Sequence, residues 1–230
     1  NHDTYRDVHR QAYEEAFRDL PQLAAPYKIN SGGKPPYHYS VDVDDVHLSL
    51  LNIVDQQLPK DVASWLKDDL KSAAGARYRF AFGHVPMHSE MGRSNQEFAR
   101  ELGGILTAGR VEAYVAGHEH LIWDENVCFD DQHTIRQLIA GTASFGYHRD
   151  PGAAYNFPLS PAIYHRYCGI NGDPLLCRMP NGGYLFKLMP HIRREAKTPA
   201  FMSLEFGGNR YEAHPYWLDP STQAIAPFGQ

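Results

Sequence analysis

Between residues 46 and 139 the sequence alternates short apolar segments with amphipathic ones, and this alternation restricts the possible folds more than any other feature. Strands are predicted over 46–54, 77–82, 111–116 and 135–139. Helices are predicted over 62–72, and from the capping-box pattern Ser94-Asn95-Gln96-Glu97 to about residue 108. Strands that alternate with helices in this way favour an α/β arrangement.

The flanking regions add elements around this core. A short helix is predicted over 9–20, and a strand over 37–43 joins the strand 46–54 through a tight turn at Asp44-Asp45. Residues 146–183 are rich in Gly, Pro, Tyr and Asn and predict a loop-rich insertion. A C-terminal β-hairpin is predicted over about 200–217, around Gly207-Gly208-Asn209. We therefore expect one domain over 1–230.

Composition excludes several classes of protein. The 22 basic and 27 acidic residues give a net charge of −5, which argues against a broad nucleic-acid-binding face. No apolar run approaches the roughly 20 residues that span a bilayer. The three cysteines form no Cys-x-x-Cys pair. Cys168 and Cys177 could form a disulfide or remain free thiols, and the pattern leans toward a secreted or periplasmic location.

Two of the predicted strands end in histidine motifs. Gly117-His118-Glu119-His120 follows the strand 111–116, and Gly83-His84 follows the strand 77–82. Sites in open α/β sheets gather outside the carboxyl ends of strands, and imidazole nitrogen suits Zn, Fe and similar ions. His88 lies four residues after His84 and either faces the same site or is a solvated loop histidine. Each motif taken alone also fits surface histidines in a turn.

A third element stands at the start of the sequence, where Asn1-His2-Asp3 offers an amide ligand and a general acid. In order, the three elements resemble the Gly-Asn-His-Asp/Glu, Gly-His and Gly-His-x-His signatures of the calcineurin-like metallophosphoesterase superfamily, which includes the purple acid phosphatases. The resemblance covers about residues 1–145, and the first of the three lacks its Gly.

The resemblance implies a layered αββα sandwich that binds two metal ions (Mn, Fe or Zn) and hydrolyses phosphate monoesters or diesters with a metal-activated hydroxide. By position, Asn1, His84 and His118 resemble ligands of the second metal, and His120 resembles a ligand of the first. His2 resembles the general acid, and Asp3 has a supporting role. The candidate substrate-binding residues are His88, Tyr147 and His148.

The sequence also departs from the family pattern. It begins after the place where the first two signatures, Asp-x-His and Gly-Asp-x-x-Asp, would lie. We therefore expect the N-terminal strands to be missing from this chain, an N-terminal segment to complete the site, and the chain alone to be weakly active or inactive. Two alternatives stay open. One is an inactive binding module with this fold. The other is a different metallohydrolase that uses Asp42, Asp44, Asp45 or Asp55.

Overall fold

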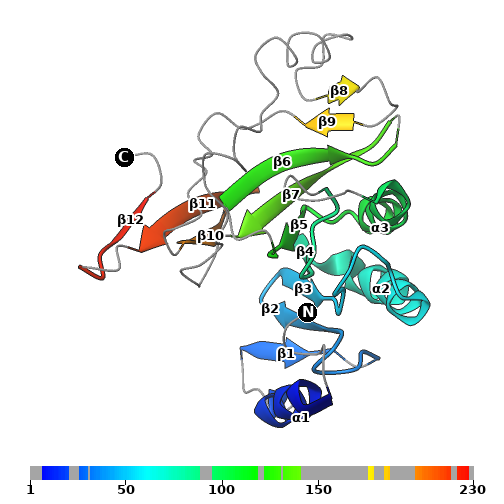
Figure 1. Ribbon diagram of the computed structural model, residues 1–230, viewed down its shortest axis with the longest axis vertical. Coiled ribbons are helices and arrows are strands. Elements are labelled where there is room, and N and C mark those ends of the chain that lie inside the picture. Colours follow the sequence, from blue (N-terminus) through cyan, green and yellow to red (C-terminus); the bar gives the residue numbers. More distant parts are fainter. Residues whose placement is uncertain are drawn as a thin grey trace.

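We describe the fold from a computed structural model (Figure 1). The described residues are 7–20, 26–30, 32–88, 95–118, 122–130, 132–140, 176–178, 184–186, 200–218 and 222–227. The helices are α1 Asp7–Ala16, α2 Lys60–Ser72 and α3 Gln96–Ala108, with a 3-10 turn Ala73–Gly75 after α2. The strands of the main sheet are β1 Tyr27–Ile29, β2 Tyr39–Val43, β3 Val46–Leu50, β4 Tyr78–Phe82, β5 Ala113–Ala116, β6 Ile122–Cys128 and β7 Thr134–Ala140. The remaining strands are β8 Leu176–Arg178, β9 Tyr184–Phe186, β10 Ala200–Gly207, β11 Arg210–Leu218 and β12 Ile225–Pro227.

The main sheet has the strand order β1-β2-β3-β4-β5-β7-β6. Its four central strands, β3, β4, β5 and β7, are parallel, and they are the strands that the sequence pattern predicted. Leu50 is paired with Phe82, and Phe82 with Val115. The predicted α/β architecture with a large central sheet is therefore confirmed, and the carboxyl ends of these strands meet at one edge of the sheet.

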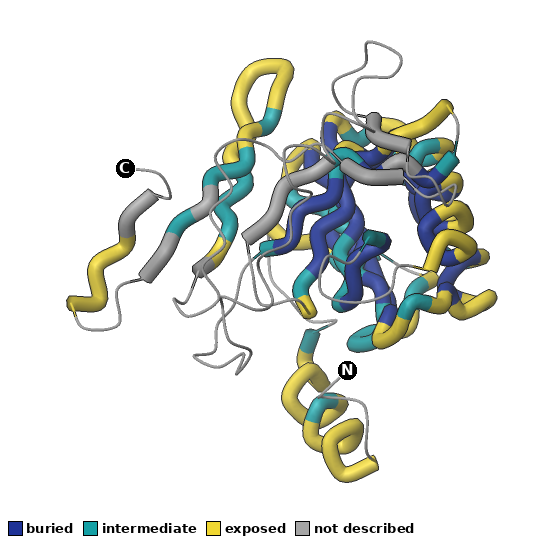
Figure 2. Tube along the Cα trace, turned by 45° about the horizontal axis from the view of Figure 1, so that its top comes forward, coloured by how far each residue is buried: buried dark blue, intermediate teal, exposed yellow. Residues whose placement is uncertain are grey.

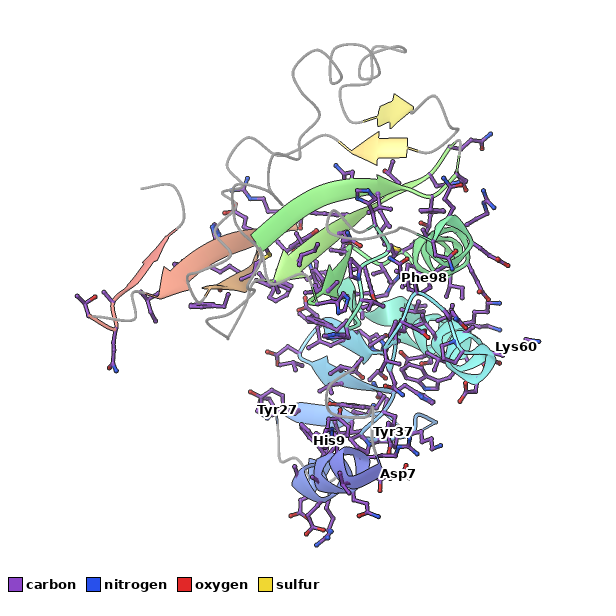
Figure 3. The ribbon with its side chains drawn as sticks, in the orientation of Figure 1. Asp7, His9, Tyr27, Tyr37, Lys60 and Phe98 are labelled. Carbon is purple, nitrogen blue, oxygen red and sulfur yellow. The ribbon has the colours of Figure 1, made fainter. Side chains whose placement is uncertain are left out.

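Helices α2 and α3 cover one face of this sheet (Figure 1). Each presents an apolar stripe of spacing three to four, and the stripes share one buried cluster with Tyr114 of β5. Figure 3 shows Phe98 on the sheet side of α3 and Lys60 pointing away from the sheet. The N-terminus of α3 differs from the predicted capping box, which began at Ser94. Asn95 is the N-cap, and its side-chain oxygen accepts hydrogen bonds from the backbone amides of Glu97 and Phe98.

A second sheet, of order β10-β11-β12, packs on the opposite face. Phe80 of β4 is completely buried there, and its ring contacts Tyr211 and Phe206 with centroids 4.9 and 5.6 Å apart. Strands β10 and β11 pair antiparallel over the segments predicted as the C-terminal hairpin. The described layers are thus helices, main sheet and second sheet, and Figure 2 shows burial concentrated in the first two.

Strands β8, β9 and β12 were not predicted, and β8 lies within the segment 146–183 that was predicted as loop-rich. Three elements nearer the core also differ from the predictions. Strand β6 was not predicted because Asp124, Glu125 and Asn126 interrupt its apolar pattern, which an edge strand paired with β7 tolerates. Strand β1 has three residues and forms only as an extension of the β2–β3 hairpin. Helix α1 ends at Ala16 rather than residue 20 and buries none of its residues (Figure 2). None of the described helices is long and apolar enough to cross a bilayer.

Candidate metal centre

The loops that follow β4 and β5 place two histidines at the carboxyl edge of the sheet. His84 comes two residues after the end of β4, and His118 comes two residues after the end of β5. Because β4 and β5 are adjacent and parallel, the two loops leave the sheet side by side. The backbone fixes this arrangement, since Gly83 N donates to Val115 O at 3.0 Å and Gly117 N donates to His84 O at 3.0 Å.

The two imidazole rings are in close edge-to-face contact. His84 Nε2 lies 3.1 Å from His118 Nδ1, and the ring planes are inclined at 78° with centroids 5.0 Å apart. Nitrogens this close share one hydrogen or direct both lone pairs at a cation. Two imidazole nitrogens at about 2.0–2.1 Å from one transition metal stand roughly 2.9–3.4 Å apart for bond angles of about 90–110°. The observed separation therefore fits two ligands of a single ion.

His118 reaches this position through an unusual backbone conformation. Its φ angle is 68°, in the left-handed region that non-glycine residues seldom adopt. Such conformations persist where the surrounding structure holds them, and they concentrate at functional sites. Here the conformation turns the chain directly after Gly117 and brings the ring of His118 against His84.

A buried tyrosine positions the loop that carries His84. Tyr114 is completely buried, and its hydroxyl donates to Val85 O at 2.8 Å. Burial raises the pKa of Tyr114, so the hydroxyl stays protonated and remains a donor. A Cβ atom at Gly83 would lie 2.1 Å from this hydroxyl, so only glycine fits there. The Gly in Gly83-His84 is thus required by the close approach of Tyr114.

Gln137 of β7 holds the far end of the same loop. Its side chain is completely buried, and its Oε1 accepts from Met87 N at 2.6 Å and from His88 N at 3.3 Å. Its Nε2 donates to His88 O at 2.9 Å. Sequence reasoning missed both Tyr114 and Gln137. The available signal was a lone glutamine in the otherwise apolar end of the strand 135–139.

The other candidate residues do not all fall within the described chain. Asn1, His2, Asp3, His120, Tyr147 and His148 lie outside it, and their roles stay predictions. His88 is half-buried with its backbone held by Gln137, and its role toward substrate also stays a prediction. Within the described ranges, no group of three or more His, Cys, Asp or Glu side chains is arranged to hold a metal ion.

The alternative metallohydrolase needed chain carboxylates beside His118, and three of the four lie elsewhere. Asp44 and Asp45 form the turn before β3, which is the end of the sheet opposite to His84 and His118. Asp42 is paired with His47 at that same end, 2.6 Å from its Nδ1. The fourth, Asp55, is exposed after β3. The direction of β2 explains the position of Asp42. Because β2 runs antiparallel to β3, Asp42 near its C-terminal end lies away from the carboxyl edge of the parallel strands.

Comparison with known proteins gives one family and several structural likenesses. The model of the family described as calcineurin-like phosphoesterase matches residues 1–121. A search of curated proteins gives no match. One similar solved structure is GAP50, the anchor in the inner membrane complex of Plasmodium, with 16% identity and a TM-score of 0.39. Another is the purple acid phosphatase PPD1 from yellow lupin (Lupinus luteus) seeds, with 11% identity and a TM-score of 0.44.

The aligned regions differ in their share of each molecule. The alignment with the Plasmodium protein covers 84% of this chain and 53% of that chain. The alignment with the lupin phosphatase covers 83% of this chain and 31% of that chain. The present chain thus spans about half of the first relative and about a third of the second.

Proposed function

Because this chain belongs to the calcineurin-like phosphoesterase family, we propose that it hydrolyses phosphate esters at the carboxyl edge of its main sheet. His84 and His118 hold one of two metal ions, and Asn1 is a further ligand of that ion. His120 is a ligand of the other ion. His2 is the general acid, and the substrate is a phosphate monoester or diester.

The observation that carries this proposal is the 3.1 Å separation between His84 Nε2 and His118 Nδ1. The two residues come from different strands and are 34 positions apart in the sequence. Both nitrogens lie at the spacing that two ligands of one transition metal require. The Gly83–Tyr114 contact and the hydrogen bonds of Gln137 hold the loop that carries His84 in place. In metal sites, residues behind the ligands orient the ligands in this way.

The chemistry follows from what these groups can do. When bound, metal ions supply a Lewis acid for the phosphoryl oxygens and lower the pKa of a coordinated water. His84 and His118 would hold one metal ion through their ring nitrogens, and the backbone hydrogen bond from Gly117 to His84 ties their two loops together. His2, when protonated, donates its proton to the oxygen of the departing alcohol. Tyr147 and His148 contact the ester group.

Metal binding and hydrolysis by the His118→Ala variant test the proposal together. The full-length protein is titrated with Zn²⁺ or Mn²⁺ by calorimetry and assayed with 4-nitrophenyl phosphate and bis(4-nitrophenyl) phosphate. We expect His118→Ala to weaken metal binding at least about tenfold and to lower metal-dependent hydrolysis about a hundredfold or more. The ratio of the two substrate rates then ranks monoester against diester.

His133→Ala is the matched control. His133 is an exposed histidine in a turn, where it pairs with Asp130 at 2.8 Å. The same change there removes an imidazole from the surface and leaves the carboxyl edge intact, so metal binding and hydrolysis should stay at the wild-type level. Equal metal affinity in the wild type and His118→Ala would contradict the proposed ligand, and metal-loaded wild type without turnover would contradict the proposed activity.

A further inference from the structure

An apolar pocket lies at the same edge of the sheet as the two histidines. Its volume is about 280 Å³. The walls come from the ends of β4, β5 and β7 on one side and from β10 on the other. The lining residues are Phe82, Gly83, Val115, Ala116, Ala140, Met202 and Leu204. The pocket therefore lies between the main sheet and the second sheet, where none of the lining side chains offers a hydrogen-bonding group.

The pocket exists because small residues end the strands. Gly83 and Ala116 follow or complete β4 and β5, and Ala140 completes β7. Elsewhere between the two sheets large side chains fill the space, as Phe80 does against Tyr211. At the edge, Met202 and Leu204 of β10 line the pocket together with Gly83, Ala116 and Ala140, which have one carbon or none in the side chain. Replacement of Ala140 by a large residue would fill this space.

The pocket and the candidate metal centre share two strand ends. Gly83, which lines the pocket, is bonded to His84, and Ala116 precedes His118 by two positions. With about 3.8 Å between consecutive Cα atoms, the backbone of each histidine lies within roughly 4–8 Å of a residue that lines the pocket. A molecule held at the histidine pair by its phosphate is thus close enough to extend its organic group into the pocket.

We propose that this pocket receives the aryl group of an aryl phosphate ester, and this inference rests on the proposed function. An apolar cavity of about 150 Å³ holds one benzene ring. The present volume therefore suits one substituted ring or two fused rings. A nucleobase fits less well because its polar edge would lose hydrogen bonds to water without finding side-chain partners.

The first arm of the test measures binding without metal or turnover. 4-Fluorophenol is titrated with the chain by ¹⁹F NMR, using the wild type, Ala140→Phe and, as a matched control, Ala74→Phe on the exposed turn after α2. Full burial of one ring is worth about ten- to a hundredfold in affinity. We expect that loss in Ala140→Phe, whose added ring fills the pocket, and no loss in Ala74→Phe. Leu204→Ala, which enlarges the pocket, should still bind.

Equal binding by Ala140→Phe and the wild type, or no binding by folded wild type, would overturn the pocket. The second arm compares kcat/KM for 4-fluorophenyl phosphate and methyl phosphate. We expect Ala140→Phe to lower the ratio of the value for 4-fluorophenyl phosphate to that for methyl phosphate by about tenfold or more. Pocket binding without hydrolysis of either ester would refute the proposed function and retain the pocket. Hydrolysis with an unchanged ratio in Ala140→Phe would refute the pocket and retain the proposed function.

Discussion

Two groups of histidine in this molecule lie on opposite ends of the same sheet and have different surroundings. His47 of β3 is 1% exposed, and its two ring nitrogens contact Asp42 and Asp69 at 2.6 and 2.9 Å. His84 and His118 lie at the carboxyl edge, where His118 is exposed and the two rings meet edge to face. His47 has a carboxylate against each of its ring nitrogens, whereas His84 and His118 contact each other through ring nitrogens 3.1 Å apart.

The buried group is a hydrogen-bonded network that joins α2 to the β2–β3 hairpin. Asp69 of α2 accepts from Ser40 of β2 at 2.5 Å and from Ser49 of β3 at 2.7 Å, in addition to His47. Burial lowers the pKa of His47, but its hydrogen bonds to Asp69 and Asp42 outweigh this effect and raise the pKa above its ordinary value. Because carboxylates occupy both ring nitrogens of His47, neither nitrogen is open to a metal ion, so this network serves the fold.

The comparison shows that the groups in contact with a histidine ring determine whether it stabilises the fold or can bind a metal ion. Carboxylates on both sides fix the charge of His47 and use both of its nitrogens. The edge pair instead brings Nε2 of His84 and Nδ1 of His118 to 3.1 Å, which is the spacing that two ligands of one transition metal require. The network should therefore control stability, and the pair should control metal binding. Three experiments test this division.

The largest expected effect is on the free energy of unfolding of Asp69→Ala. The change removes the shared acceptor of His47, Ser40 and Ser49 and leaves buried donors and a charge without their partner. Loss of one partner of a buried ion pair costs about 3–5 kcal/mol. Urea unfolding measures the loss, with Asp68→Ala as control because Asp68 is its exposed neighbour on α2. That control should change stability by less than about 0.5 kcal/mol. Equal stability of the two variants would break the comparison.

A smaller effect is expected from Gly83→Ala, which crowds the loop of the edge pair. The new Cβ would lie 2.1 Å from the Tyr114 hydroxyl, and such overpacking costs about 1–3 kcal/mol. In the Tyr114→Phe background the nearest atom is Cζ at 2.9 Å, so the same change should cost less. Urea unfolding of the four proteins in this cycle gives the coupling. Metal affinity should also fall in Gly83→Ala, because the strain moves His84. Additive free energies would refute the positioning role of Tyr114.

The smallest effect is a pH dependence of stability. The pKa of His47 is higher in the folded state than its ordinary value of 6.5. Its charged form therefore stabilises the fold fully below about pH 6.5, and this contribution is lost as the pH rises through the folded pKa. We expect the stability difference between the wild type and His47→Gln, measured by urea unfolding, to be larger at pH 6 than at pH 8.5. A difference that grows with pH would mean that His47 is neutral in the fold.

Local sequence pattern was sufficient for much of the fold. The four parallel strands, both core helices and the C-terminal hairpin follow from apolar periodicity and turn residues. It failed for β6, whose polar centre is stabilised by pairing with β7, and for β1, which has too few residues to show a period. The histidines at the strand ends were also visible in the sequence, because Gly-His follows each of two apolar segments.

The sequence by itself determined which residues end the parallel strands, and hence that His84 and His118 leave the sheet at its carboxyl edge. Only the tertiary structure decided that the ring nitrogens of His84 and His118 meet. It also decided that Tyr114 and Gln137 hold the loop that carries His84, and that Asp69 of α2 contacts His47 in the buried network. The physical reason is sequence separation. These partners are 22 to 50 positions apart, and strand order and register, which local patterns do not encode, bring them together.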